Sequence, residues 1–192
     1  MIDNNVEEIK KNIAKIMEVL EIPITESNEN TPLRIAKMLC NEVFVNRNDR
    51  NLGELNDKMK VFPNEYETGL IVMKDIDFSS MCEHHWMPFF GKVSVGYVPN
   101  DTIVGLSKIP RVVKYYSKRP QLQEQLTSEI GDYLFNLLSP KAVFVEIVAE
   151  HTCVKCRGAE SDCMTETSYK KFEDGIDPAN QKDWYSEFKQ RM

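Results

Sequence analysis

Histidine, long apolar runs and an excess of positive charge are all scarce in this sequence. The longest apolar runs, such as residues 142–145, fall far short of the roughly 20 residues that a membrane-spanning helix needs. A net charge of −6 argues against nucleic acid or an acidic membrane as a partner, although it leaves room for a local basic pocket. Met1 leads straight into a polar segment, so no signal peptide is expected.

The cysteines do not follow the pattern of a secreted, disulfide-linked protein. There are five of them, an odd number, and their spacing is not that of a disulfide framework. We therefore expect reduced thiols in a cytoplasmic protein.

The chain has 192 residues, of which 42% are hydrophobic, and can bury a substantial core. We expect an N-terminal helical region over residues 1–62, a main domain over 63–172 and a C-terminal tail over 173–192. The sequence contains no internal repeat and no low-complexity segment that would suggest another organisation.

All three histidines lie in two short segments, and each segment also carries a cysteine. Cys82 and His85 are three residues apart in a predicted loop, where a thiolate and an imidazole can bind one ion, and Cys153 is a third candidate ligand. Two thiolates and one imidazole favour zinc. Three protein ligands leave the fourth position open, as in a catalytic site. The alternative is a closed structural site whose fourth ligand is Cys156 or Cys163.

Apolar residues at three- and four-residue steps predict helices over residues 6–20, 31–43, 107–116 and 122–138. Thr31 and Ser107 are candidate N-caps, and Pro32 and Pro110 fall in the first turns that follow them. Asp177-Pro178 predicts a last helix, whose apolar pair Trp184 and Phe188 is expected to pack on the chain's own domain more readily than on a partner. Residues 46–63 are interpreted as a connection with a helical turn around 53–60.

Strand patterns appear from Gly69 onward. Residues 70–78 lead into the Cys82–His85 loop, while residues 92–97 and 102–106, joined by Pro99-Asn100-Asp101, predict an antiparallel hairpin. Residues 142–149 form a further strand that delivers His151 and Cys153 at its end, and residues 165–169 form a shorter one. The order predicts an α+β protein with an antiparallel sheet.

Several of these segments, taken together and in order, resemble the GTP cyclohydrolase I family. The resemblance runs from about Thr31 to about Tyr169 and rests on Cys82-Glu83-His84-His85, Pro88-Phe89-Phe90-Gly91, Gly105-Leu106-Ser107-Lys108, Arg119-Pro120-Gln121-Leu122-Gln123-Glu124 and His151-Thr152-Cys153-Val154-Lys155-Cys156-Arg157-Gly158. It implies the tunnelling fold, with helices packed on one face of the sheet and an N-terminal helical pair. It also implies a homodecamer with sites between subunits, and conversion of GTP and water to dihydroneopterin triphosphate and formate.

The resemblance implies a role for each matching residue. Cys82, His85 and Cys153 match the zinc ligands, and His84 and His151 match the catalytic histidines; His84 could instead be an adjacent residue that only supports the site. The reaction needs a nucleophile at carbon 8 of guanine, which zinc-activated water supplies, and a proton for nitrogen 7, which His151 can donate.

The remaining implied residues bind the nucleotide. Glu124 can accept hydrogen bonds from the two adjacent donors of guanine, and Gln123 is expected to contact the substrate beside it. The triphosphate is expected to contact one hydroxyl group and several cationic side chains. These belong to Ser107, Lys108, Arg111, Arg157, Arg34 and Lys37. The last two are also typical of a solvated helix face.

The chain departs from the family pattern at Pro110, at the added thiol of Cys156, and in the tail after Tyr169. None of these changes removes a ligand. Two other functions remain open: an enzyme of the same fold that acts on another purine or pterin, and a non-catalytic binding module stabilised by zinc.

Overall fold

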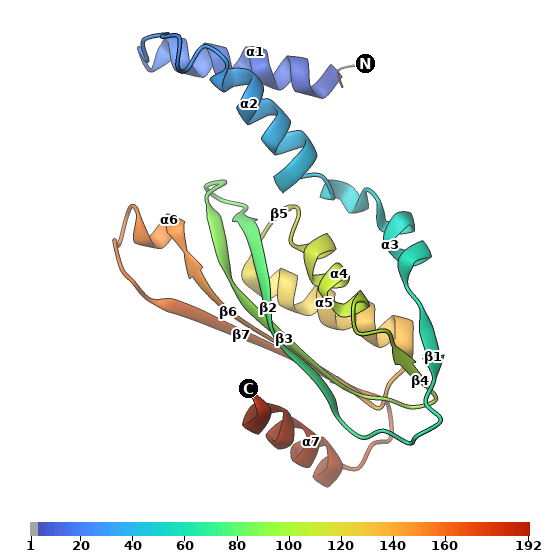
Figure 1. Ribbon diagram of the computed structural model, residues 1–192. Helices are drawn as coiled ribbons and strands as arrows, with labels where there is room; N and C mark the ends of the chain where they lie inside the picture. Colours follow the sequence, from blue (N-terminus) through green and yellow to red (C-terminus); the bar gives the residue numbers. More distant parts are fainter. Residues whose placement is uncertain (1–3) are drawn as a thin grey trace.

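The computed structural model of this chain describes residues 4–192, so Met1–Asp3, where the predicted N-terminal region begins, lie outside the described residues. Figure 1 shows a twisted sheet with helices on both sides and two helices that project from one end. The helices are α1 (Asn4–Val19), α2 (Thr31–Met38), α3 (Leu52–Lys58), α4 (Lys108–Tyr116), α5 (Gln123–Leu138), α6 (Thr152–Lys155) and α7 (Pro178–Arg191). The strands are β1 (Val61–Pro63), β2 (Ile71–Cys82), β3 (Pro88–Val98), β4 (Thr102–Val104), β5 (Pro120–Gln121), β6 (Ala142–His151) and β7 (Met164–Phe172).

The main sheet has the strand order β5-β2-β3-β6-β7. Neighbouring strands are antiparallel except for the short β5, which runs parallel to the end of β2. β3 lies in the centre, and its residue Phe89 pairs directly with His151 of β6. The predicted α+β class and the predominantly antiparallel sheet are confirmed.

One face of the sheet is covered by α4 and α5. Leu126, Ile130 and Leu134 of α5 are fully buried, and they share one core with the alternating valines and aromatic residues of β3 and β6. Burying such a side chain stabilises the fold by about 1.5–3 kcal/mol. The apolar side chains that recur about every 3.6 residues in α5 therefore pack against the apolar side chains that alternate along the strands. The sequence predicts both patterns.

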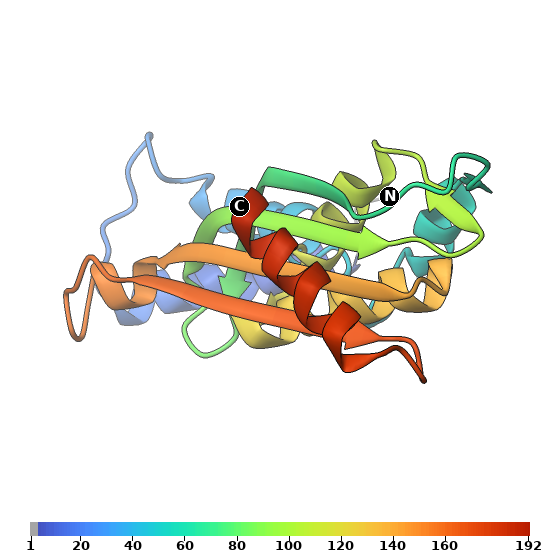
Figure 2. The same ribbon diagram turned by 90° about the horizontal axis from the view of Figure 1, so that it is seen from below.

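The last helix covers the opposite face, in addition to the predicted layer of helices formed by α4 and α5. In Figure 2, seen from below, α7 crosses the strands. Its Phe188 is 1% exposed and packs with Leu70 and Phe144. Phe188 also occupies the space above Gly96, where an added Cβ atom would lie 2.6 Å from its ring. Packing of this helix on its own domain is therefore confirmed.

The predicted hairpin of residues 92–97 with 102–106 is wrong. β4 pairs instead with β1, and the two form a separate small sheet. The reason is that both edges of β3 are already occupied, one by β2 and the other by β6. A strand with no free edge cannot accept a further partner, so the turn after Val98 directs the chain away from the sheet.

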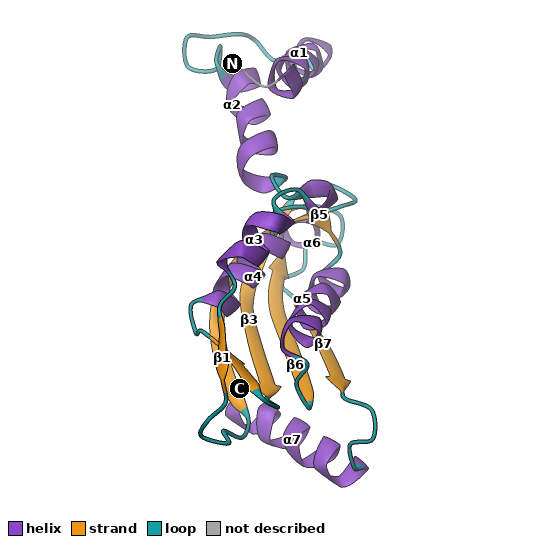
Figure 3. Cartoon of the chain, turned by 90° about the vertical axis from the view of Figure 1, so that its right-hand side faces the viewer, coloured by secondary structure: helices purple, strands orange, loops and turns teal. Residues whose placement is uncertain are grey.

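The N-terminal helices form a small core of their own around Val6, Ala36 and Cys40. Figure 3 shows α1 and α2 standing away from the sheet. The edge-to-face contact of Phe44 with Trp86, with ring centroids 5.3 Å apart, joins this region to the β2–β3 turn. Thr31 does not act as the predicted cap, since it is the first residue of α2 itself. None of the helices within residues 4–192 is both long and apolar enough to cross a membrane.

Candidate metal centre and active site

Two chain segments that are far apart in the sequence meet at one end of the sheet. Cys82 is the last residue of β2, and His151 is the last residue of β6, just before Cys153 in α6. A tight turn links β2 to β3, because the Trp86 amide donates to the Cys82 carbonyl at 2.9 Å and the Cys82 amide donates to the Met87 carbonyl at 2.9 Å. β2 and β6 pair with the two edges of β3. The β2–β3 turn and α6 therefore both lie at the end of the sheet where β3 begins.

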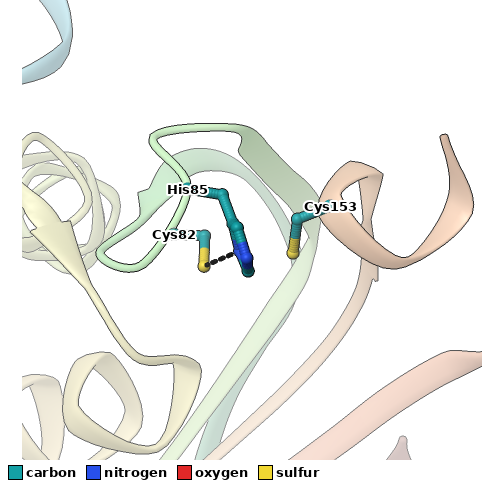
Figure 4. Close-up of side chains that lie close together, drawn as sticks. All are labelled: Cys82, His85 and Cys153. Carbon is teal, nitrogen blue, oxygen red and sulfur yellow. Dashed lines mark hydrogen bonds between the residues drawn. The ribbon is translucent and has the colours of Figure 1, made fainter. Parts of the chain in front are cut away.

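The predicted metal ligands converge. The ligand atoms of Cys82, His85 and Cys153 all lie within 4.8 Å of one another, and Cys82 Sγ is 3.8 Å from His85 Nδ1. Figure 4 shows the three side chains directed toward a common point. Tetrahedral zinc holds such atoms about 3.5–3.8 Å apart, so the group needs only small side-chain rotations to bind the ion. The donor set and the spacing both fit zinc.

The thiols also show why this group fits a cation. Burial raises the pKa of the Cys153 thiol, and the hydrogen bond with Cys82 and the charge of that neighbour raise it further. Two adjacent thiolates repel each other, and a divalent cation removes that repulsion. Cys156 and Cys163 are exposed and are not in the converging group. The arrangement therefore favours the open three-ligand site over the closed alternative.

His151 lies beside these ligands, in a partly apolar environment. Its ring is parallel to that of Phe89, with centroids 4.7 Å apart. Burial lowers the pKa of His151, while the carboxylate of Glu124 acts in the opposite direction. Its Nε2 atom is 2.7 Å from Oε1 of Gln123. A histidine that is fixed in this way and faces a carboxylate can act as an acid–base group.

The other residues near the ligands differ in exposure. Glu124 is exposed at the start of α5 and faces His151 closely enough to affect its pKa. Gln123 is 2% exposed, and its Oε1 atom is in contact with His151. His84 has its Nδ1 atom 3.9 Å from Cys82 Sγ and an exposed ring. The positive charge of Arg157 acts on the Cys153 thiol.

The structure separates most of the predicted phosphate-binding residues, apart from Arg157, from the metal ligands. Ser107 and Lys108 follow β4 at the far end of the sheet, and Arg111 lies one turn further along α4 (Figure 1). Arg34 and Lys37 are exposed on α2, in the projecting helical region. Ser107, Lys108 and Arg111 therefore lie away from the metal centre within one chain.

Two features of the site were not predicted from the sequence. Phe89 supplies the surface against which His151 stacks, and the hydroxyl groups of Thr127 and Thr167 join the network around Gln123. Phe89 could have been identified only from the pairing of β3 with β6. The two threonines come from α5 and β7, so no local pattern links them.

Three converging candidate ligands with a partly buried, acid–base-competent histidine beside them, carried on an α+β fold, form the arrangement expected of a metal-dependent enzyme. Its sequence matches the family model described as GTP cyclohydrolase I over residues 9–187. The chain belongs to the GTP cyclohydrolase I family, and the prediction that it is an enzyme is confirmed. The match continues past Tyr169 through most of α7, so the tail is not the departure that the sequence indicated.

Relatives support the same assignment. The chain is 41% identical over 162 residues to a GTP cyclohydrolase 1 of Porphyromonas gingivalis. This alignment covers 83% of this chain and 82% of the relative. It is 38% identical over 179 residues to GTP cyclohydrolase 1 of Finegoldia magna, covering 91% and 95%. Among solved structures, an archaeosine synthase QueF-Like in the apo form aligns with a TM-score of 0.45 and 19% identity, over 54% of this chain and 94% of that one.

Proposed function

We propose that this chain is a zinc-dependent GTP cyclohydrolase I, which opens the imidazole ring of the guanine of GTP and forms 7,8-dihydroneopterin triphosphate and formate. The observation that carries the proposal is the convergence of Cys82, His85 and Cys153 beside His151 in a member of this family. When bound, zinc would supply the Lewis-acid chemistry that makes water a nucleophile near neutral pH. The three ligands leave one coordination position for that purpose.

The chain's own residues perform the proton transfer and hold the base. His151 is the acid that protonates nitrogen 7 as the bond from carbon 8 breaks, and carbon 8 leaves as formate after the second bond breaks. Glu124, across from His151, accepts from the ring N–H and the exocyclic amine of guanine. This pairing holds the five-membered ring of guanine toward the metal centre. His84, whose ring is exposed beside Cys82, is the second proposed catalytic histidine.

The triphosphate is proposed to bind to residues of another copy of the chain. Ser107, Lys108 and Arg111 lie at the opposite end of the sheet from Cys82 and Cys153. α4 begins beside β4 and not beside the metal ligands, so these three side chains and the metal centre lie apart within one chain. This separation supports a homo-oligomer with sites at subunit interfaces, and we propose the homodecamer of the family. Arg34, Lys37 and Arg157 are the further candidate contacts to the phosphates.

The same proposal includes the cellular location. The five free cysteines fit a reducing compartment, so we propose that the enzyme works in the cytoplasm. An enzyme of the same fold that acts on another purine or pterin would keep the metal centre and differ in the groups around Glu124. A zinc-stabilised binding module would not need His151.

The decisive experiment supplies zinc-loaded protein with GTP and measures formate and dihydroneopterin triphosphate. We expect the two products in equal amounts. Glu124→Gln should raise KM for GTP about 10- to 100-fold, because one of two charge-assisted hydrogen bonds is lost. Glu26→Gln, at an exposed position before α2, is the matched control and should leave KM unchanged. Absence of ring opening at saturating zinc and GTP would contradict the proposal.

A further inference from the structure

The side-chain amide of Gln123 is enclosed by acceptors. Its Nε2 atom lies 3.0 Å from the carbonyl oxygen of Ile147 and 3.1 Å from that of Thr165. A carbonyl oxygen can only accept, so the group that faces these two atoms has to be the NH2 end of the amide. The neighbouring strands β6 and β7 therefore set the orientation of Gln123.

A third contact agrees with this orientation. The Thr127 hydroxyl donates to the backbone carbonyl of Gln123 at 2.7 Å, which uses its one hydrogen atom. The contact of 2.6 Å between the hydroxyl groups of Thr127 and Thr167 must then have Thr167 as the donor. Thr167 has no further hydrogen atom to offer, so its oxygen accepts from Nε2 of Gln123 at 3.1 Å.

The remaining amide atom, Oε1, faces His151 Nε2 at 2.7 Å. An amide oxygen accepts, so this ring nitrogen has to carry a hydrogen atom. The parallel stacking on Phe89 holds the ring plane, and rotation of the ring by a half turn would place a carbon atom against Oε1. One tautomer of the neutral ring satisfies these contacts, with hydrogen on Nε2 and a free lone pair on Nδ1.

We infer that Gln123 is a positioning residue that holds His151 in the Nε2–H tautomer, so that Nδ1 is the ring atom that takes up a proton and then donates it to nitrogen 7 of the substrate. The role of Nδ1 in catalysis rests on the proposed function, whereas the tautomer does not. Within residues 4–192, no hydrogen-bond partner is found for Nδ1 of His151. Gln123 is 2% exposed and its two N–H groups already serve three acceptors, so its side chain has no donor left for a nucleotide.

The tautomer can be measured directly, without turnover. In zinc-loaded protein without GTP, at mildly alkaline pH, two-dimensional NMR of 15N-labelled histidine distinguishes a protonated ring nitrogen from an unprotonated one. The chain has three histidines, and the His151 signals are assigned by their loss in His151→Asn. We expect wild-type His151 to have a protonated Nε2 and an unprotonated Nδ1. The opposite pattern would overturn the inference.

A variant of Gln123 then tests whether this residue is the cause. Gln123→Met keeps the size of the side chain but not its polar atoms, and we expect His151 to show a mixture of tautomers. Gln121→Met is the control for the loss of a buried glutamine, since Gln121 is 1% exposed and bonds to Ser80 and Tyr116 instead.

Kinetics separates a positioning role from a direct contact with substrate. Gln123→Met should lower kcat about 10- to 100-fold, as expected for loss of a partner that orients an active-site histidine, and should change KM for GTP much less. A Gln123→Met protein with wild-type tautomer, or with raised KM and unchanged kcat, would overturn the inference. If instead no variant and no wild-type protein opened GTP, the proposed function would fail while the tautomer measurement would still stand.

Discussion

His151 and Phe89 lie directly opposite each other on β6 and β3, and their rings are parallel with an interplanar angle of 1°. The pairing places the side chain of a fully buried core residue beneath the histidine that we propose as the acid. The central strand of the sheet therefore determines the plane of the catalytic ring.

Phe89→Leu should loosen this ring. We expect kcat to fall about 10-fold, by analogy with other residues that orient an active-site histidine. The core loses about 1–2 kcal/mol of stability at the same time. Phe78→Leu, in the neighbouring ring that packs edge-to-face on Phe89, should cost similar stability and leave kcat unchanged. Equal kcat values for the two variants would contradict a role of Phe89 in orienting His151.

Replacing the metal ligands tests the open site. Zinc content should fall from about one per chain to near zero in Cys82→Ser and in Cys153→Ser, because two ligands bind zinc far more weakly than three. Cys156→Ser and Cys163→Ser should keep the wild-type content, since neither thiol converges with the group. The measurement is atomic emission on dialysed protein. Loss of zinc in Cys156→Ser would point to the closed structural site.

Removal of the proposed acid separates chemistry from metal binding. We expect His151→Ala to retain zinc and to lose turnover by a factor of about 100 or more. Zinc content and the rate of formate release are measured on the same preparation. A His151→Ala protein that turns over normally would contradict the role of His151 as the acid.

Two inactive variants should restore each other's activity. Lys108→Ala and Cys153→Ala remove groups from opposite ends of the sheet, so a site made by two chains can contain one intact contribution from each. With equal amounts and random assembly, about one quarter of such sites carry both intact groups. The rate of formate release after co-expression is the readout. Mixed oligomers that form, as judged by tagged-subunit capture, but remain inactive would contradict sites shared between chains.

The stabilisation that Asp132 of α5 gains from its contacts with β7 should depend on pH. Burial raises the pKa of Asp132, but the hydrogen bonds from Lys171 and Tyr169, each 2.8 Å long, outweigh burial and lower that pKa below its ordinary value. A carboxyl whose pKa is lower in the folded chain stabilises the fold above its unfolded pKa of about 3.9, and this contribution is lost as pH falls through the folded value.

Asp132→Asn should therefore destabilise the chain at about pH 7 by less than about 1 kcal/mol, because the half-exposed pair is screened by solvent. Its stability should approach that of the wild type as pH falls through the lowered pKa of folded Asp132, because both proteins then carry a neutral group at this position. Urea denaturation at several pH values measures the difference. A difference that persists unchanged in acid would show that packing, and not charge, is responsible.

The elements with a clear period are the ones that the sequence predicted. The stripe of apolar residues from Leu126 to Leu138 predicts α5, and the alternation from Ala142 onward predicts β6 and, at its end, His151. The three candidate metal ligands were also predictable, since histidine is used in only two segments and each segment has a cysteine. Local patterns carry this information because each one involves neighbouring residues.

Strand pairing and the network around Gln123 could not be predicted in the same way. The choice of β1 as the partner of β4 depends on the fact that β2 and β6 already occupy both edges of β3. The contact of Gln123 with His151 depends on the packing of α5 against β6 and β7. Both are relationships between distant segments, and no residue type at a fixed spacing indicates them.

The ring of Phe188 beneath Gly96 has a consequence for how sequences of this kind can diverge. A larger residue can enter position 96 only in a chain that no longer has an aromatic ring at position 188. Positions 96 and 188 are therefore expected to covary among relatives, although the first belongs to a central strand and the second to the last helix.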